Sequence, residues 1–127
     1  MKVIVDTNIM IDYMKRPTKE LKDAFKKENV VLCGVVISEL LHGAVSEKDL
    51  STLKADLSLF ESYNLKDDDW FNFGEFLFEL RTNGLTVPYA DAIISYIAIR
   101  NGFAVWTRDK HFKLIKAVRE ELIIYNQ

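Results

Sequence analysis

Residues 1–8 read MKVIVDTN. The β-branched run at residues 3–5 is typical of a strand buried on both faces, and it stops at Asp6 before a helical pattern begins at Ile9. Asp6 is therefore expected where a central strand ends. In open α/β sheets, ligands bind outside the carboxyl ends of the strands, so Asp6 is a candidate site residue.

Asp6 also has a purely structural explanation. Asp at a strand–helix junction commonly forms an Asx-turn or caps the helix that follows. Thr7 or Asn8 can serve as that cap as well, and the exposed N–H groups of a helix start favour anions nearby. A functional site here requires further acidic residues from other strands.

Bulk composition bounds the class of protein. A length of 127 residues fits one domain, spanning 1–127, and 49% hydrophobic with 28% charged residues is ordinary for a globular protein. The longest apolar run, 92–99, contains a serine and is too short to cross a bilayer. The N-terminus has no signal-peptide pattern. We expect one cytoplasmic domain that does not associate with membranes.

Cysteine and charge counts narrow the chemistry. Cys33 is the only cysteine of the chain, which excludes an internal disulfide and a thiolate metal site. The net charge of −2 is unfavourable for nucleic-acid binding. Setting four of the 19 acidic residues aside as metal ligands leaves 15, against 17 basic residues. Any affinity for nucleic acid must then come from local placement and from metal.

Strand and helix patterns alternate along the chain. Strand patterns occur at residues 3–5, 30–33, 103–106 and 122–125, and helical patterns at 9–14, 18–25, 36–44, 46–60, 70–81, 90–99 and 110–118. Residues 63–65 are too short a run to assign. The alternation predicts an α/β fold, a three-layer α/β/α sandwich with a mostly parallel central sheet.

The segment from 67 to 81 has two unusual features. Three consecutive aspartates at 67–69 are expected to form a solvent-exposed helix N-terminus rather than a metal site. The helix at 70–81 is rich in aromatic residues that point in more than one direction. Either this helix contacts a second subunit, or it is buried on both sides within one large core.

Four acids stand at comparable places in the pattern. Glu39 and Asp109 follow strands as Asp6 does, and Asp91 opens an otherwise apolar helix. Right-handed crossovers bring the ends of parallel strands to one sheet edge, so these acids can meet. Two carboxylates ~4 Å apart repel by roughly 4 kcal/mol at an effective dielectric of about 20. Such a cluster needs a cation or must take up protons.

The donor types point to a hard cation. With no cysteine cluster and no histidine at an obvious ligand spacing, carboxylate oxygens favour Mg²⁺ or Mn²⁺ over Zn²⁺. A site of this kind supports metal-assisted hydrolysis of phosphodiesters. The sequence contains no Ser-His-Asp arrangement, Walker-type loop or Gly-x-Gly-x-x-Gly pattern that would compete with this interpretation.

Four motifs resemble those of a known family. VDTN at 5–8, SELLHGA at 38–44, PYADAII at 88–94 and TRDKHF at 107–112 look like the successive motifs of PIN-domain ribonucleases, and are most similar to those of VapC toxins. The resemblance implies a PIN-like fold. It also implies an acidic Mg²⁺ site, with Mn²⁺ as an alternative ion, made of Asp6, Glu39, Asp91 and Asp109, and supported by Thr7, Asn8 and Thr107.

The resemblance also implies partners. It predicts a homodimer, an RNA substrate and a VapB-like antitoxin protein whose tail occupies the active-site groove. Arg108 and Lys110 are candidate RNA contacts, although solvated surface explains them equally well. His42 and His111 are expected at the rim of the groove rather than as catalytic bases.

The leading functional hypothesis is a Mg²⁺-dependent endoribonuclease that acts as a toxin. One alternative is a PIN-fold module that binds RNA or protein without catalysis. Another is an aspartyl-phosphate phosphatase, which also uses an Asp just after a first strand. That chemistry requires a second Asp two residues later, where this chain has Asn8.

Overall fold

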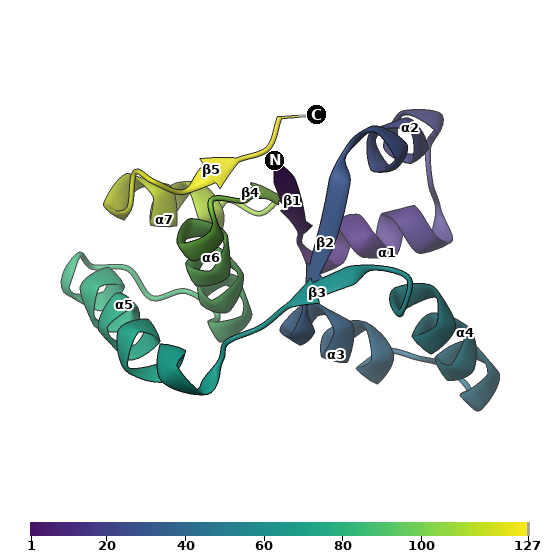
Figure 1. The fold of residues 1–127 in the computed structure, drawn as a ribbon, viewed down its shortest axis with the longest axis horizontal. Helices are drawn as coiled ribbons and strands as arrows, with labels where there is room; N and C mark the ends of the chain where they lie inside the picture. The colour runs from purple at the N-terminus through teal and green to yellow at the C-terminus, as the bar shows by residue number, and fades with distance from the viewer. Residues whose placement is uncertain (127) are drawn as a thin grey trace.

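A computed structural model describes residues 1–126 and contains a five-stranded sheet (Figure 1). The strands lie in the order β3-β2-β1-β4-β5, and all four pairings between them are parallel. Their bounds are β1 Lys2–Val5, β2 Asn29–Cys33, β3 Glu61–Tyr63, β4 Ala104–Trp106 and β5 Ile123–Ile124. β1 is central, so the residue that follows it lies in the middle of the carboxyl edge of the sheet.

Helices flank the sheet on both sides, with α1, α2 and α4 to the right and α5, α6 and α7 to the left in Figure 1. Their bounds are α1 Thr7–Lys15, α2 Lys19–Lys27, α3 Gly34–His42, α4 Glu47–Leu57, the short 3₁₀ helix η1 Asp67–Asp69, α5 Trp70–Thr82, α6 Tyr89–Asn101 and α7 His111–Val118. The predicted α/β architecture with a parallel central sheet is confirmed. Within residues 1–126, the helices are too short or too polar to cross a bilayer.

Local sequence explains where the helices begin and end. The hydroxyls of Thr18 and Ser46 accept hydrogen bonds from the backbone of the first turns of α2 and α4, at 3.1 and 3.0 Å. α6 ends at Gly102, whose φ of 70° is a left-handed conformation that glycine adopts without strain. The cap of α1 is Asp6, so the expectation that Thr7 or Asn8 caps this helix is wrong.

The core lies on both faces of the two central strands. Residues 3–5 of β1 and 30–33 of β2 are all buried, as the apolar runs predict for strands covered on both sides. On one side, Phe25 of α2 lies 5.1 Å from the Trp106 ring of β4. Parallel pairing of Val5 with Trp106 places the ends of β1 and β4 side by side, where Asp6 and Thr107 follow.

The sequence leaves one strand unassigned, and one local prediction differs from the structure. β3 is a real strand, but its burial is slight and its sequence, ESY, lacks an apolar pattern, so periodicity could not identify it. Asp69 is buried rather than solvent-exposed. It accepts a hydrogen bond from the Lys66 N–H at 2.8 Å and pairs with the Arg100 guanidinium at 3.0 Å, so it joins η1 to α6.

The aromatic residues of α5 divide into two groups. Phe73 and Phe76 are buried in the core, whereas Trp70, Phe71 and Phe78 are 53%, 88% and 59% exposed. Burial of this helix on both sides within one core is therefore wrong. A contact between the exposed face and a second subunit remains a prediction.

Candidate active site

Asp6 is fixed by its neighbours at the carboxyl end of β1. Its Oδ1 accepts a hydrogen bond from the Thr7 N–H at 2.7 Å, and its Oδ2 accepts one from the Thr107 hydroxyl at 2.8 Å. The residue is only 7% exposed. Asp6 is thus both a helix cap and an oriented carboxylate, and the two explanations of this residue are compatible.

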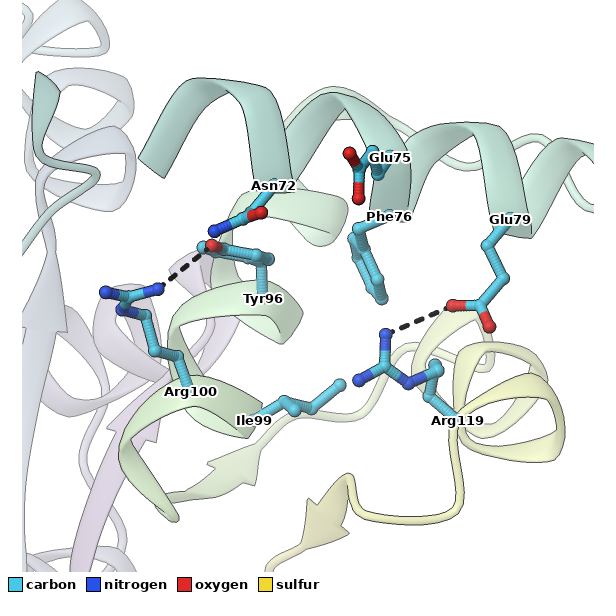
Figure 2. Close-up of a pocket in the computed structure, with 8 residues that line it drawn as sticks. All are labelled: Asn72, Glu75, Phe76, Glu79, Tyr96, Ile99, Arg100 and Arg119. Carbon is cyan, nitrogen blue, oxygen red and sulfur yellow. Dashed lines mark hydrogen bonds and ion pairs between the residues drawn. The ribbon is translucent and has the colours of Figure 1, made fainter. Parts of the chain in front are cut away.

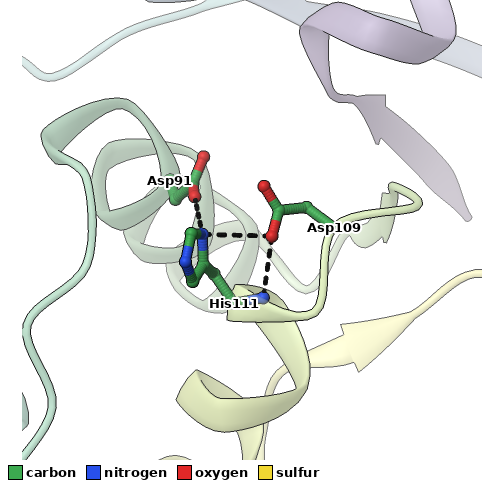
Figure 3. A group of neighbouring side chains, drawn as sticks. All are labelled: Asp91, Asp109 and His111. Atoms are coloured by element: carbon green, nitrogen blue, oxygen red, sulfur yellow. Dashed lines mark hydrogen bonds and ion pairs between the residues drawn. The ribbon is translucent and has the colours of Figure 1, made fainter.

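A second group of side chains lies at the starts of α6 and α7 (Figure 3). The Nδ1 atom of His111 lies 3.0 Å from an oxygen of Asp91 and 3.0 Å from an oxygen of Asp109. One donor atom from each of these residues lies within 4.8 Å of the other two. Two acids separated by 18 positions in the sequence therefore meet around one imidazole.

Thr107 and Thr7 connect these groups. The Thr107 hydroxyl, which donates to Asp6, also accepts the Asp109 N–H at 2.9 Å. The Thr7 hydroxyl donates to an oxygen of Glu39 on α3 at 3.0 Å. All four predicted acids therefore belong to one hydrogen-bonded network at the carboxyl edge of the sheet. Glu39 is its most exposed member, and it joins the network only through Thr7.

The electrostatics of Asp91 reflect this crowding. Burial raises the pKa of the Asp91 carboxyl, and the charges of Asp6 and Asp109 raise it further, against the opposing hydrogen bond from His111. The ionised form of Asp91 is therefore less favourable at this position than in an exposed Asp. A positive charge placed among these carboxylates would relieve the repulsion.

The donor set is suited to a metal ion. Asp91, Asp109 and His111 offer two carboxylates and one imidazole nitrogen, and Asp6 brings a third carboxylate, which is buried, to the same edge. Oxygen-rich sites of this kind bind hard divalent cations. An acidic cluster that could bind a metal is thus present.

His111 lies closer to the acids than expected. The sequence placed it at the rim of the groove, but its ring is in contact with Asp91 and Asp109. The spacing Asp-x-His at 109–111 was the available signal, because a residue two positions along a tight turn can fold back on the first. His42, by contrast, is exposed at the end of α3.

The remaining predicted site residues lie at the surface. Asn8 and Lys110 are exposed, and the Arg108 guanidinium pairs with Asp12 of α1. A small hollow of about 230 Å³ adjoins the acids, and its polar lining includes Thr107, Asp109, Lys110 and Lys113. Cationic side chains thus border the acidic network on the α7 side.

A larger cavity of about 480 Å³ lies elsewhere, between α5 and α6 (Figure 2). Two arginines line it, and both are already paired. Arg100 contacts Asp69 and the Tyr96 hydroxyl, and Arg119 contacts Glu79 and Glu121. The arginines of this cavity already have partners, so it is a weaker candidate site than the acidic network.

Comparison with known proteins agrees with this geometry. The chain is 27% identical over 116 residues to Ribonuclease VapC1 of Methanocaldococcus jannaschii, an alignment that covers 91% of this chain and 82% of the relative. DNA-bound VapBC from Salmonella typhimurium superimposes with a TM-score of 0.84 at 23% identity, covering 98% of this chain and 97% of that one. VapBC-1 from nontypeable Haemophilus influenzae superimposes with a TM-score of 0.82 at 20% identity, covering 99% of this chain and 98% of that one.

The two solved structures share the fold at low sequence identity. The PIN domain family matches this chain over residues 3–118, from within β1 to the end of α7. All four acids of the network and His111 lie within this range. This chain therefore belongs to the PIN domain family.

Proposed function

We propose that this chain is a divalent-metal-dependent endoribonuclease and the toxin of a VapBC-type toxin–antitoxin pair. The observation that carries this proposal is the meeting of Asp6, Asp91 and Asp109 at one sheet edge. Membership of the PIN family supports it, as does the similarity to a protein named as a ribonuclease. The solved VapBC structures with the same fold support the toxin–antitoxin part.

Asp6, Glu39, Asp91 and Asp109 are the proposed ligands of Mg²⁺, with Mn²⁺ as the alternative. When bound, such an ion supplies Lewis-acid chemistry, since it activates water and neutralises the charge that develops on a phosphoryl group. The protein itself has to hold these carboxylates in fixed positions relative to one another.

Hydrogen bonds perform this task. Thr107 bridges Asp6 and the backbone of Asp109, so it fixes one carboxylate relative to another strand end. Thr7 gives its N–H to Asp6 and its hydroxyl to Glu39, which joins α3 to the same edge. These threonines are positioning residues for the proposed ligands.

RNA would approach across the exposed rim of the network. Lys110 is a proposed phosphate contact, and Asn8 is proposed as a polar group that orients ligands or water. Arg108 is a weaker candidate, because a phosphate would have to compete with Asp12 for its guanidinium. Placement of cations beside the acids, rather than net charge, is what would attract the substrate.

We also propose two protein partners for this chain, an antitoxin and a second copy of itself. A VapB-like antitoxin would bind the toxin and inhibit it, and the two would act in the cytoplasm, where the RNA is. We also propose a homodimer, for which the exposed aromatic face of α5 (Trp70, Phe71 and Phe78) is the candidate contact.

The test is to sequence RNA 5′ ends after brief induction of the chain in cells. New, discrete 5′ ends that appear with the wild type and not with Asp109→Asn support the proposal. A matched variant, Asp56→Asn, changes an exposed acid of α4 outside the network and should leave the new ends in place. Equal patterns from wild type and Asp109→Asn would contradict the proposal and favour a PIN-fold binding module without catalysis.

A further inference from the structure

His111 brings an imidazole nitrogen among the proposed metal-binding carboxylates (Figure 3). Its Nδ1 is 3.0 Å from Asp91 Oδ2 and 3.0 Å from Asp109 Oδ1. The four motif acids do not require a nitrogen donor at this place. His111 nevertheless contacts two of these acids, which a solvent-exposed histidine without a role in the site would not need to do.

These separations match neighbouring positions around a metal ion. In an octahedral site with bonds of about 2.1 Å, adjacent ligand atoms lie about 3.0 Å apart and opposite ones about 4.2 Å apart. The three donor atoms lie within 4.8 Å of one another. One ion can therefore bind all three atoms once the widest pair closes from at most 4.8 Å to about 4.2 Å, which is a small movement of the side chains.

The backbone holds the imidazole in this position. The His111 N–H donates to Asp109 Oδ1 at 2.9 Å, which closes the turn between β4 and α7. The next residue, Phe112, is fully buried and anchors the start of α7. The His111 side chain is 41% exposed, so its other nitrogen, Nε2, can carry the proton and bind water while Nδ1 presents a lone pair.

We propose that His111 is a direct ligand of the divalent ion, which makes the site a mixed oxygen and nitrogen site. This inference rests on the metal site of the proposed function and deepens it. Imidazole binds Mn²⁺ and later transition metals better than Mg²⁺, which prefers oxygen. The site should therefore favour Mn²⁺ over Mg²⁺, and the preference should depend on His111.

Electron spin-echo spectroscopy of the Mn²⁺-loaded full chain tests this directly. Nitrogen bound to Mn²⁺ modulates the echo, and His42 and His111 are the only histidines of the chain. We expect a coordinated-imidazole signal in the wild type and in His42→Asn, and none in His111→Asn. Absence of the signal from the wild type, or its loss only in His42→Asn, would overturn the proposal.

Calorimetric titration of each ion gives a second measurement. Asn at position 111 places an amide near the Nδ1 position, so His111→Asn keeps a hydrogen-bond donor for the two acids while it removes the imidazole. We expect Mn²⁺ affinity to fall at least about tenfold, and Mg²⁺ affinity to fall much less. If the ratio of the two affinities is the same in His111→Asn and wild type, His111 only positions the carboxylates and the proposal is wrong.

These outcomes are separate from those for RNA cleavage. A chain that binds Mn²⁺ with an imidazole signal but cleaves no RNA would contradict the proposed function and leave the ligand assignment in place. A chain that cleaves RNA with Mg²⁺ but shows no imidazole signal with Mn²⁺ would contradict the ligand assignment of His111 and leave the proposed function in place. Circular dichroism of His111→Asn checks that the fold is retained, which its partial exposure leads us to expect.

Discussion

The Thr107 hydroxyl donates a hydrogen bond of 2.8 Å to Asp6, across 101 positions of sequence. The two residues follow neighbouring parallel strands, β1 and β4, whose register pairs Val5 with Trp106. The same hydroxyl accepts the N–H of Asp109 at 2.9 Å. One threonine thus sets the relative position of two of the proposed metal ligands.

Thr107→Val should reduce RNA cleavage at least about tenfold, the usual scale for groups that orient metal ligands. Valine keeps the shape but removes both hydrogen bonds, so Asp6 and Asp109 lose their common partner. Thr107→Ser should restore most of the rate. Cleavage assays with Thr52→Val as control check this, since the Thr52 hydroxyl only contacts the Lys48 carbonyl on an exposed helix. Equal rates for Thr107→Val and wild type would refute the positioning role.

Asp91→Asn should stabilise the metal-free protein at neutral pH. Asparagine removes a buried charge next to Asp6 and Asp109, and its amide oxygen can still accept from His111. We expect Tm to rise by about 3 °C, the shift that roughly 1 kcal/mol produces in a domain of this size. Calorimetry with a chelator present makes the comparison, and a lower Tm for the variant would contradict it.

The stabilisation should depend on pH in one direction. A carboxyl with a raised pKa binds its proton more tightly in the folded chain, so the associated stability is present below the unfolded-state pKa and is lost as pH rises through the folded value. The ordinary Asp pKa here is 3.8. The Tm difference between Asp91→Asn and wild type should therefore vanish near that pH and grow above it. A difference that is constant with pH would mean that Asp91 does not titrate as described.

Adding Mg²⁺ should make wild type more stable than Asp91→Asn. An ion present at about 100 times its dissociation constant stabilises the protein that binds it by roughly 2.7 kcal/mol, or about 8 °C. Wild type should gain this shift and Asp91→Asn much less of it, because one ligand is missing. Thermal melts over a Mg²⁺ series, with Ca²⁺ run alongside, give the result. Identical shifts in both proteins would place the ion somewhere other than this network.

Phe71→Glu should separate a dimer into monomers without unfolding the chain. Phe71 is 88% exposed on α5, so a charge there costs little in the monomer but would disrupt an apolar contact. Light scattering at several concentrations reports the mass. Leu114→Glu, a change at a half-exposed position of α7, is the matched control. A dimer that survives Phe71→Glu would show that the contact lies on another face.

The sequence was most informative about buried strands and the residues that follow them. Apolar runs identified β1, β2 and β4, and a parallel sheet brings their carboxyl ends to one edge whatever the details of packing. This is why Asp6 and Asp109 could be expected together. The edge strand β3 could not be found, because its residues are mostly exposed and leave no pattern.

Side-chain detail was not available from the sequence. That His111 contacts both Asp91 and Asp109 depends on the turn between β4 and α7 and on where α6 starts. That Asp69 is buried depends on Arg100 of a helix further along the chain. Both facts concern which long-range partner a polar group finds, and periodicity carries no information about such partners.

The central claim is that these acids act together on RNA through a bound divalent ion. The most direct test is the single-turnover rate of cleavage of a defined RNA by wild type and Asp6→Asn as Mg²⁺ is varied. Asn caps helices as well as Asp does, so α1 should remain intact and only the charge is lost. We predict a rate that rises with Mg²⁺ for wild type and is at least about 10²-fold lower for Asp6→Asn. Equal rates for the two proteins, or cleavage by wild type that persists in excess chelator, would contradict the claim.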